Sequence, residues 1–370
     1  MERQCKWAFL GAANIARKNW QSVFHSGNGV VGVVASRSAE RAQNFIDACQ
    51  QHVAFDSPAL AVEGYEAVLQ DGSIDAVYIP LPTAIRGKWA KAALEAGKHV
   101  LIEKPCSTSA DELRELIAIA KSKNLQLMDG VMFSHSQRFD SLMQLVHQQK
   151  EIGDVRRVTS QFSFFADDDW IKTDIRGNAN FEPFGALGDL GWYCIRLALA
   201  MASDKLPVRV LGNAIQTHRH PDADEAVPVE FDATLFFDDG LSSSFYCSFV
   251  TELQQWANIS GSQGYVSIED FALPFHDTKT RFEIVKSKFN TDTCSFEMSR
   301  NGEIREFDEP SDSAVGSQES LLFRDFNQCV IQGKTDNSWA AHSLRTQIVM
   351  DALLESSRIG QPIELAQQKD

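Results

Sequence analysis

The chain of 370 residues is long enough for two domains, and its composition (44% hydrophobic, 23% charged) is that of an ordinary globular protein. A net charge of −15, with no run of more than two basic residues, argues against a nucleic acid or an anionic membrane surface as a partner. The sequence contains no run of 18 apolar residues, so no membrane span is predicted. Its seven scattered cysteines, without a Cys-x-x-Cys pair, are typical of a reducing, cytoplasmic location.

The first 130 residues alternate short apolar runs with amphipathic stretches. Ser109 and Glu112 have the spacing of a capping box and predict the start of the last helix. Strands buried on both faces and separated by helices predict an α/β domain with a doubly wound parallel sheet. We expect strands at 7–10, 30–35, 76–79, 99–102 and 125–128, and helices at 14–26, 38–51, 58–70, 85–96 and 110–124.

Residues 131–370 have a different pattern, in which several apolar runs alternate with a period of two. The turn Asp238–Gly240 predicts a hairpin between two of these strands. This part is therefore expected to be an α+β domain with a mostly antiparallel sheet, and we place the boundary between the domains at 1–130 and 131–370. We expect strands at 155–164, 233–237, 241–250, 255–269 and 281–287, helices at 316–332 and 340–357, and loops at 173–185 and 305–318.

The first strand leads into a loop that matches the dinucleotide-binding pattern G-x-G-x-x-[GA] with one exception. Gly11 supplies the tight turn, Ala16 suits close packing of helix on strand, and Ala13 replaces the glycine at which the backbone approaches a pyrophosphate. The strand before the loop and the helix after it favour a nucleotide loop over an ordinary turn. Its candidate cofactor-binding residues are Gly11, Ala12, Ala13, Asn14 and Ile15.

The second strand ends in Ser36 and Arg37, with Arg41 one turn further on, where an NAD-specific domain carries Asp or Glu. Hydroxyl and guanidinium groups suit a 2′-phosphate, which arginine binds through charge-assisted contacts. The sequence therefore favours NADP(H) over NAD(H). A solvated helix start with Ser38 as its N-cap is the alternative.

Two further segments follow strands of the same sheet. Pro80, Leu81, Pro82 and Thr83 restrict the backbone where a nicotinamide ribose would pass. Glu103-Lys104-Pro105 follows the apolar run 99–102, and a lysine at the carboxyl end of a parallel strand lies where open α/β sheets bind ligands. A cis bond before Pro105 would fix the direction of the lysine.

Asp189 and Tyr193 lie in a Gly-rich stretch that opens an apolar helix ending near Met201. At a spacing of four, they share one face of that helix. Dipole complementation and packing are the ordinary explanations for an acid and a tyrosine at such positions.

Taken together, these segments resemble the glucose–fructose oxidoreductase / inositol dehydrogenase / MocA (Gfo/Idh/MocA) family over essentially the whole chain. Residues 35–38, 128–132, 174–176 and 185–193 are similar to the branch of dihydrodiol dehydrogenases and NADP-dependent D-xylose 1-dehydrogenases. The resemblance implies an N-terminal Rossmann domain and a C-terminal domain that binds substrate and forms a homodimer, or a higher homo-oligomer, through a large open sheet. It implies that Lys104 is the catalytic lysine, with Asp189 and Tyr193 beside it. Arg86 departs from the family, which usually has histidine near this position.

The function expected is hydride transfer between the nicotinamide of NADP(H) and a hydroxyl or carbonyl of a sugar or related polyol or diol, in either direction. We assign Tyr193 as the proton-transferring group, with Lys104 tuning it and Asp189 orienting a neighbouring hydroxyl. The reverse assignment, with Lys104 as the base, stays open. Aromatic and polar side chains that are candidates to line the pocket are Phe133, His135, Phe165, Trp170 and Arg176.

Two other functions remain as alternatives: a redox-assisted NAD-dependent glycosidase, and a non-catalytic dinucleotide-binding regulator of a sugar pathway. A regulator has no need of Lys104, Asp189 and Tyr193 together. His218, His220, Asp222 and Asp224 lack metal-ligand spacing, so we expect a surface loop there and no metal site. Asp167–Asp169 is expected to be a solvated acidic loop.

Overall fold

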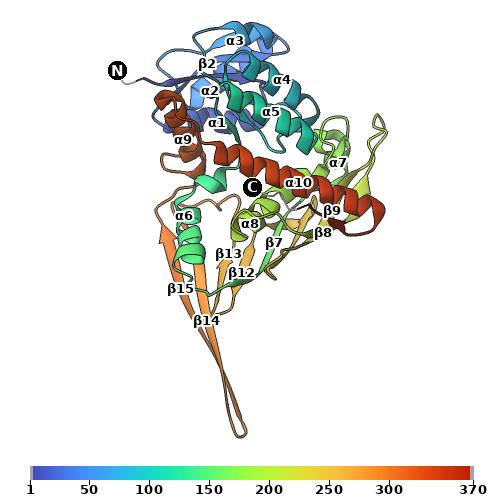
Figure 1. The fold of residues 1–370 in the computed structure, drawn as a ribbon. Coiled ribbons are helices and arrows are strands. Elements are labelled where there is room, and N and C mark those ends of the chain that lie inside the picture. Colours follow the sequence, from blue (N-terminus) through green and yellow to red (C-terminus); the bar gives the residue numbers. More distant parts are fainter. Residues whose placement is uncertain (1–2, 367–370) are drawn as a thin grey trace. The chain divides into compact units, whose positions relative to one another are not determined.

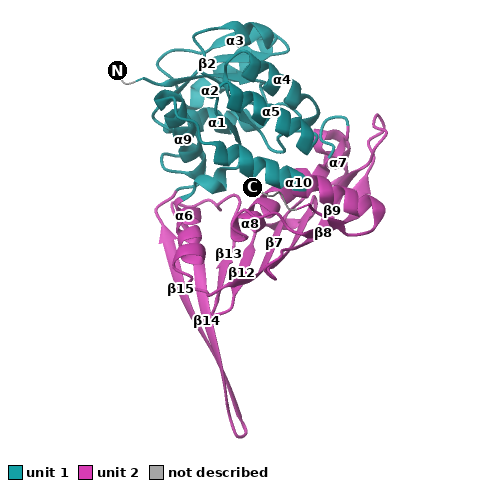
Figure 2. Cartoon of the chain, in the orientation of Figure 1, with its two compact units in different colours: residues 1–136, 180–183, 310–348 teal, residues 137–179, 184–309, 349–370 magenta. Residues whose placement is uncertain are grey.

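The computed structural model describes residues 3–366, which form two compact units that are each discontinuous in sequence (Figure 2). Among these residues, unit 1 contains 3–136, 180–183 and 310–348, and unit 2 contains 137–179, 184–309 and 349–366. This division differs from the single boundary expected near residue 130. The reason is that segments from the C-terminal half return to the N-terminal sheet and complete its packing.

Unit 1 is built on a six-stranded parallel sheet with strand order β3-β2-β1-β4-β5-β6, the doubly wound order expected (Figure 1). Its strands are β1 (Cys5–Leu10), β2 (Gly29–Ser36), β3 (Leu60–Glu63), β4 (Ala76–Ile79), β5 (His99–Ile102) and β6 (Leu127–Asp129). Its helices are α1 (Asn14–His25), α2 (Ala39–His52), α3 (Glu66–Gln70), α4 (Thr83–Glu95), α5 (Ala110–Ser122), the 3-10 turn η1 (Met132–His135), α9 (Gln318–Gln332) and the first part of α10 (Asn337–Ile359).

The helix expected at 58–70 is wrong, because this segment contains strand β3 and the short helix α3. Leu60 to Glu63 extend the sheet beside β2, and Gly64 then adopts a φ of +77°, which ends the strand. The predicted helix start at Ser109 is confirmed, since its hydroxyl accepts a hydrogen bond from the Glu112 backbone N–H at 3.2 Å, while the Glu112 carboxylate accepts from the Thr108 N–H at 2.9 Å.

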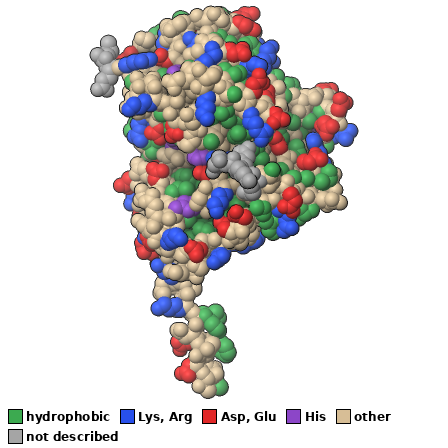
Figure 3. Space-filling model, viewed as in Figure 1, with side chains coloured by type: hydrophobic (Ala, Val, Ile, Leu, Met, Phe, Trp, Pro, Cys, Tyr) green, Lys and Arg blue, Asp and Glu red, His purple; other side chains and the backbone are tan. Residues whose placement is uncertain are grey.

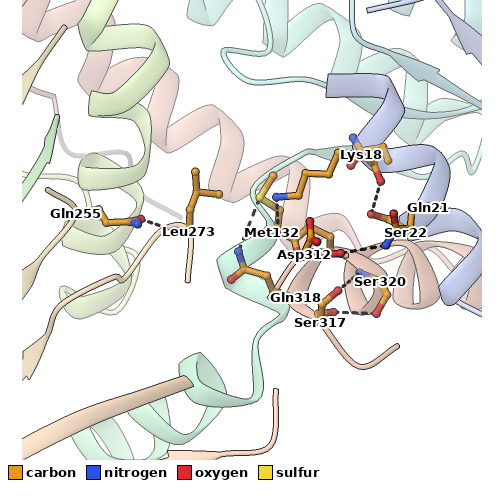
Figure 4. A network of polar contacts seen from close by, with 12 residues as sticks. Lys18, Gln21, Ser22, Met132, Gln255, Leu273, Asp312, Ser317, Gln318 and Ser320 are labelled. Carbon is orange, nitrogen blue, oxygen red and sulfur yellow. Dashed lines mark hydrogen bonds and ion pairs between the residues drawn. The ribbon is translucent and has the colours of Figure 1, made fainter. Parts of the chain in front are cut away.

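Helix α9 is part of the hydrophobic core of unit 1. Trp7 of β1 packs against Phe323 and Phe326, and its indole N–H donates to Asn327 Oδ1 at 2.8 Å. Polar contacts tie the same region to α1: Lys18 pairs with the buried Glu319 at 2.6 Å, and Gln21 donates to the Asp312 carbonyl at 3.1 Å (Figure 4). The Rossmann-type sheet is therefore completed by residues that are some 300 positions distant in the sequence.

Unit 2 contains a ten-stranded, mostly antiparallel sheet in the order β15-β14-β13-β12-β7-β10-β9-β8-β16, with β11 paired to β7. Its strands are β7 (Val155–Phe165), β8 (Arg209–His218), β9 (Val227–Phe236), β10 (Ser242–Ser248), β11 (Val250–Gln254), β12 (Ala257–Gly261), β13 (Tyr265–Ile268), β14 (Thr280–Asp292), β15 (Ser295–Phe307) and β16 (Ile363–Glu364). Its helical elements are α6 (Gln137–Met143), η2 (Gln144–Gln148), α7 (Asp168–Thr173), η3 (Ile175–Gly177), η4 (Leu187–Gly191), α8 (Trp192–Met201) and the last part of α10.

The hairpin expected at Asp238–Gly240 is confirmed between β9 and β10, and Gly240 takes a φ of +83°. Two loop predictions are wrong. Asp167 caps α7, its carboxylate accepting from the Trp170 N–H at 2.8 Å, so Asp168 and Asp169 lie in a helix. The predicted loop at 305–318 begins inside β15, which forms with β14 a ribbon projecting from the rest of unit 2 (Figure 1).

Candidate active site

The candidate cofactor-binding residues and Lys104 lie in unit 1, at the carboxyl ends of neighbouring parallel strands. Strands β1, β4 and β5 lead into Gly11, Pro80 and Glu103. These three residues lie at the same edge of the sheet because their strands are neighbours in it. Gly11 has a φ of +127°, and a Cβ there would lie 3.1 Å from Leu81 Cδ2. Glycine is therefore required both for the turn and for the close approach of the second loop.

Ala13, the unusual residue of the glycine loop, adopts an extended conformation (φ −85°, ψ 159°) as the N-cap of α1. An L-residue adopts this conformation without strain, which explains why alanine is tolerated. Asn14 and Ile15 open the helix, and Ala16 is fully buried. Ala13 supplies no side-chain cap to α1, and the backbone N–H groups at a helix N-terminus favour an anion.

At the end of β2, Ser36 is buried while Arg37 and Arg41 are exposed. Ser38 caps α2, its hydroxyl accepting from the Arg41 N–H at 3.2 Å, and the Arg41 guanidinium contacts the Ala12 carbonyl of the glycine loop at 3.5 Å. Tyr65 lies close to both guanidinium groups: burial raises its pKa, and the charges of Arg37 and Arg41 lower it by a smaller amount. Sequence reasoning missed Tyr65, which follows a strand that was not predicted.

The Glu103-Lys104-Pro105 turn contains the cis peptide bond expected before Pro105. Behind it lies a buried polar cluster, in which the Tyr78 hydroxyl donates to Glu103 Oε1 at 2.6 Å and Asn19 donates to the Tyr78 oxygen at 2.6 Å. Burial, followed by the Glu103 charge, raises the pKa of Tyr78 well above its usual value. Glu103 also accepts from the Lys104 backbone N–H at 3.3 Å, so the half-buried lysine is held by a braced turn.

Arg86 joins the two loops that flank this lysine. Its buried guanidinium donates to the Leu81 carbonyl at 2.8 Å, to the Thr83 hydroxyl at 3.1 Å, and to the Pro105 carbonyl. The Thr83 hydroxyl in turn donates to Glu182 at 2.5 Å, and the Thr83 N–H donates to the other Glu182 oxygen at 3.1 Å. Glu182 lay in a predicted loop, and no motif around it indicates this role.

Asp189 and Tyr193, the other two candidate catalytic residues, lie in unit 2. Asp189 belongs to the π-helical turn η4, and Tyr193 follows in the first turn of α8, so the regular i, i+4 spacing expected is altered by a wider turn. Single π turns occur frequently at functional sites. The buried Tyr193 packs on Phe162 with ring centroids 5.6 Å apart.

Of the candidate lining residues, the structure brings Trp170 and Arg176 to Asp189. The Arg176 Nε lies 2.9 Å from the Asp189 carboxylate, and its guanidinium carbon lies 5.9 Å from the centre of the Trp170 ring. Phe165 is 66% exposed at the end of β7.

The other two candidate lining residues belong to unit 1. Phe133 is buried in η1, and His135 is paired with Asp325 at 2.9 Å.

The chain belongs to the GFO/IDH/MocA family of oxidoreductases. The family profile described as "Oxidoreductase family, NAD-binding Rossmann fold" matches residues 5–131, and the profile of the family's C-terminal domain matches residues 141–267. The protein is therefore an enzyme of the dehydrogenase and reductase class that binds a nicotinamide dinucleotide.

Curated relatives include D-xylose 1-dehydrogenase (NADP(+)) 2 of Haloferax volcanii, 28% identical over 97% of this chain and 99% of the relative. A dTDP-3,4-didehydro-2,6-dideoxy-alpha-D-glucose 3-reductase of Saccharopolyspora spinosa is 29% identical over 98% of both chains. The reductase of the same name from Streptomyces violaceoruber is 36% identical, but the match spans only 56% of this chain and 57% of that protein.

Solved structures agree in fold. KijD10, a 3-ketoreductase from Actinomadura kijaniata in complex with NADP and TDP-benzene, superposes with a TM-score of 0.77 and 25% identity over 96% of this chain and 98% of that one. An aldose-aldose oxidoreductase from Caulobacter crescentus gives a TM-score of 0.78 at 19% identity, over 98% of this chain and all of that one.

No helix in residues 3–366 combines the length and apolar character that crossing a bilayer needs. Over the same residues, no group of three or more His, Cys, Asp or Glu side chains is arranged to hold a metal ion.

Proposed function

We propose that this enzyme transfers a hydride between the nicotinamide of NADP(H) and a hydroxyl or carbonyl group of a sugar or a related polyol or diol. The observation that carries the proposal is the braced turn at Lys104, at the carboxyl end of β5 and two strands from the strand that leads into the glycine loop. Relatives named as a xylose dehydrogenase and as sugar 3-reductases support a carbohydrate substrate.

The preference for NADP(H) rests on the end of β2. Arg37 and Arg41 are exposed and converge near Tyr65, and no carboxylate occupies the strand end where one would bind a free ribose 2′-hydroxyl. Two guanidinium groups attract a 2′-phosphate by charge and by hydrogen bonding. The residues present therefore fit NADP(H), with Gly11 to Ile15 receiving the pyrophosphate at the start of α1 and Pro80 to Thr83 bordering the nicotinamide ribose.

When bound, the nicotinamide accepts or supplies the hydride. The chain's part is to move the proton of the reacting oxygen and to orient the substrate. Tyr193 is the proton-transferring group in this proposal, Lys104 hydrogen-bonds the reacting oxygen and favours the phenolate, and Asp189 orients a neighbouring hydroxyl from its position beside Arg176. Trp170 contributes an aromatic wall near that carboxylate.

The proposal includes a cytoplasmic location, based on the cysteine usage, and assembly as a homodimer or higher homo-oligomer through the open sheet of unit 2. That sheet contacts α6, η4 and α8, and β10 presents Ser242, Ser244 and Tyr246 on the opposite face.

The test is a spectrophotometric assay for reduced nicotinamide, with NADP⁺ and NAD⁺ offered separately against aldoses, polyols and a trans-dihydrodiol. We expect turnover with NADP⁺ and one substrate class. Lys104→Ala is expected to abolish turnover while the cofactor still binds, and Lys121→Ala, which removes an exposed lysine of α5, is the matched control. Full activity of Lys104→Ala would remove this lysine from the mechanism.

A further inference from the structure

The ribbon of β14 and β15 has one apolar face that its own chain leaves uncovered. Phe289, Phe296, Met298 and Ile304 are 61%, 70%, 81% and 59% exposed, and hydrophobic side chains gather near the end of the ribbon (Figure 3). Phe289 pairs directly with Met298, and the Phe289 and Phe296 rings are 6.0 Å apart. Exposed apolar surface concentrated in this way marks an interaction site.

The opposite face of the same ribbon is polar. Lys288 pairs with Ser299, and Asn290 pairs with Glu297, so alternate residues divide the ribbon into an apolar and a polar side. A solvated ribbon has no need of this division, and an isolated two-stranded ribbon is only marginally stable in water. The apolar side of the ribbon is therefore expected to pack against another protein surface.

The apolar side of the ribbon continues into the open face of the sheet. A row of directly paired residues, which share a face, crosses eight strands. It consists of Ile304, Glu283, Ser267, Asn258, Thr159, Ser244, Thr234 and Leu211. The row begins and ends with an exposed apolar side chain and has mostly small polar side chains between them, so it forms a broad flat surface.

The size of this surface indicates its occupant. Eight strands spaced about 4.8 Å apart, each about seven residues long at about 3.3 Å per residue, present roughly 900 Å². A standard protein interface buries about 800 Å² per partner. A second copy of this chain offers a face of the same width, and a twofold pairing of like faces forms a closed assembly.

We propose that the apolar side of the ribbon packs against a second copy of this chain. The ribbon would then act as a clasp, a projecting element that holds the two copies together. This inference rests on the homo-oligomer proposed above and adds to it that Phe289, Phe296 and Met298 stabilise the assembly from outside the body of the sheet. The ribbon carries as many basic as acidic residues, so it meets no net repulsion from a partner whose charge is −15.

The test compares two double variants of the full chain by sedimentation velocity across a concentration series. Phe289→Ser with Met298→Ser removes the apolar side, and Lys288→Ser with Glu297→Ser alters the polar side at neighbouring positions of the same ribbon. We expect the first pair to weaken the assembly at least tenfold and the second pair less than threefold. Both should keep the native thermal unfolding profile, because all four side chains are exposed.

An assembly that forms normally and is unaffected by Phe289→Ser with Met298→Ser would overturn the clasp while leaving the homo-oligomer intact. A monomeric native chain at micromolar concentration would overturn both. Cys294 at the tip, the exposed cysteine among residues 3–366, gives a second readout. We expect its reaction with a maleimide to slow at least fivefold on assembly, and an unchanged rate would show that the ribbon stays in solvent.

Discussion

Replacing Arg86 by methionine is expected to destabilise unit 1 by about 2–6 kcal/mol, because buried acceptors lose their charged hydrogen-bond donor. Methionine fills much of the same volume, so the loss comes from hydrogen bonds. The carbonyls of Leu81 and Pro105 lose a charged donor inside the protein, at about 1–3 kcal/mol each. Thr83 loses less, because its hydroxyl keeps Glu182 as a partner.

The free energy of unfolding should be measured by urea titration, following far-UV circular dichroism and tryptophan fluorescence. Arg86→Lys is the matched control: it keeps the charge but cannot reach all three acceptors, so its loss should be intermediate. In Arg86→Met, the affinity for NADP⁺ should fall together with the free energy of unfolding, since the two loops that Arg86 joins both border the proposed cofactor site. A loss below 1 kcal/mol, or equal losses for lysine and methionine, would refute the reasoning.

Three further outcomes are expected. Arg37→Ala should weaken NADP⁺ binding about 10–100-fold and NAD⁺ binding less than threefold, measured by fluorescence titration; equal losses would mean that Arg37 does not read the 2′-phosphate. Tyr193→Phe should lower kcat by about two to four orders of magnitude while unfolding normally, because the ring still packs on Phe162; a change under tenfold would move the proton transfer elsewhere. Burial lowers the pKa of His99, whose Nδ1 accepts a hydrogen bond from the Gln126 N–H at 2.9 Å. As the pH falls, the imidazole is therefore protonated in the unfolded chain before it is protonated in the folded one, and the free energy of unfolding should decline below about pH 6.5. His99→Asn should flatten that decline between pH 7.5 and 5.5, and an unchanged slope would exclude His99 as its source.

The sequence was sufficient to predict the parallel sheet because each of its strands is a short apolar run beside a helix with a clear period. It failed at 58–70, where Leu60 and its neighbours are half-exposed on an edge strand and lack the apolar character of the inner strands. It also stopped β14 at residue 287, because the distal half of the ribbon is exposed on both strands and has no buried face to give a pattern.

Within the candidate site, motifs located Gly11, Arg37 and Lys104, since each follows a strand at a fixed offset. Local motifs did not identify the residues that hold these segments in place. Glu182 contacts Thr83, which is 99 residues distant in the sequence, and the guanidinium of Arg86 binds two separate loops, which leaves no local signature. The assignment of catalytic roles to Lys104, Asp189 and Tyr193 stays a prediction.

The packing of Trp7 against Phe323 and Phe326 has a consequence for synthesis. Strand β1 leaves the ribosome more than 300 residues before the aromatic partners of its Trp7 are made. Until then Trp7 has no Asn327 to accept its indole N–H, and the core around β1 is incomplete. The core of unit 1 around β1 is therefore completed only once α9 has been made, and a chain that terminates before α9 leaves Trp7 without these partners and exposed to chaperones and proteases.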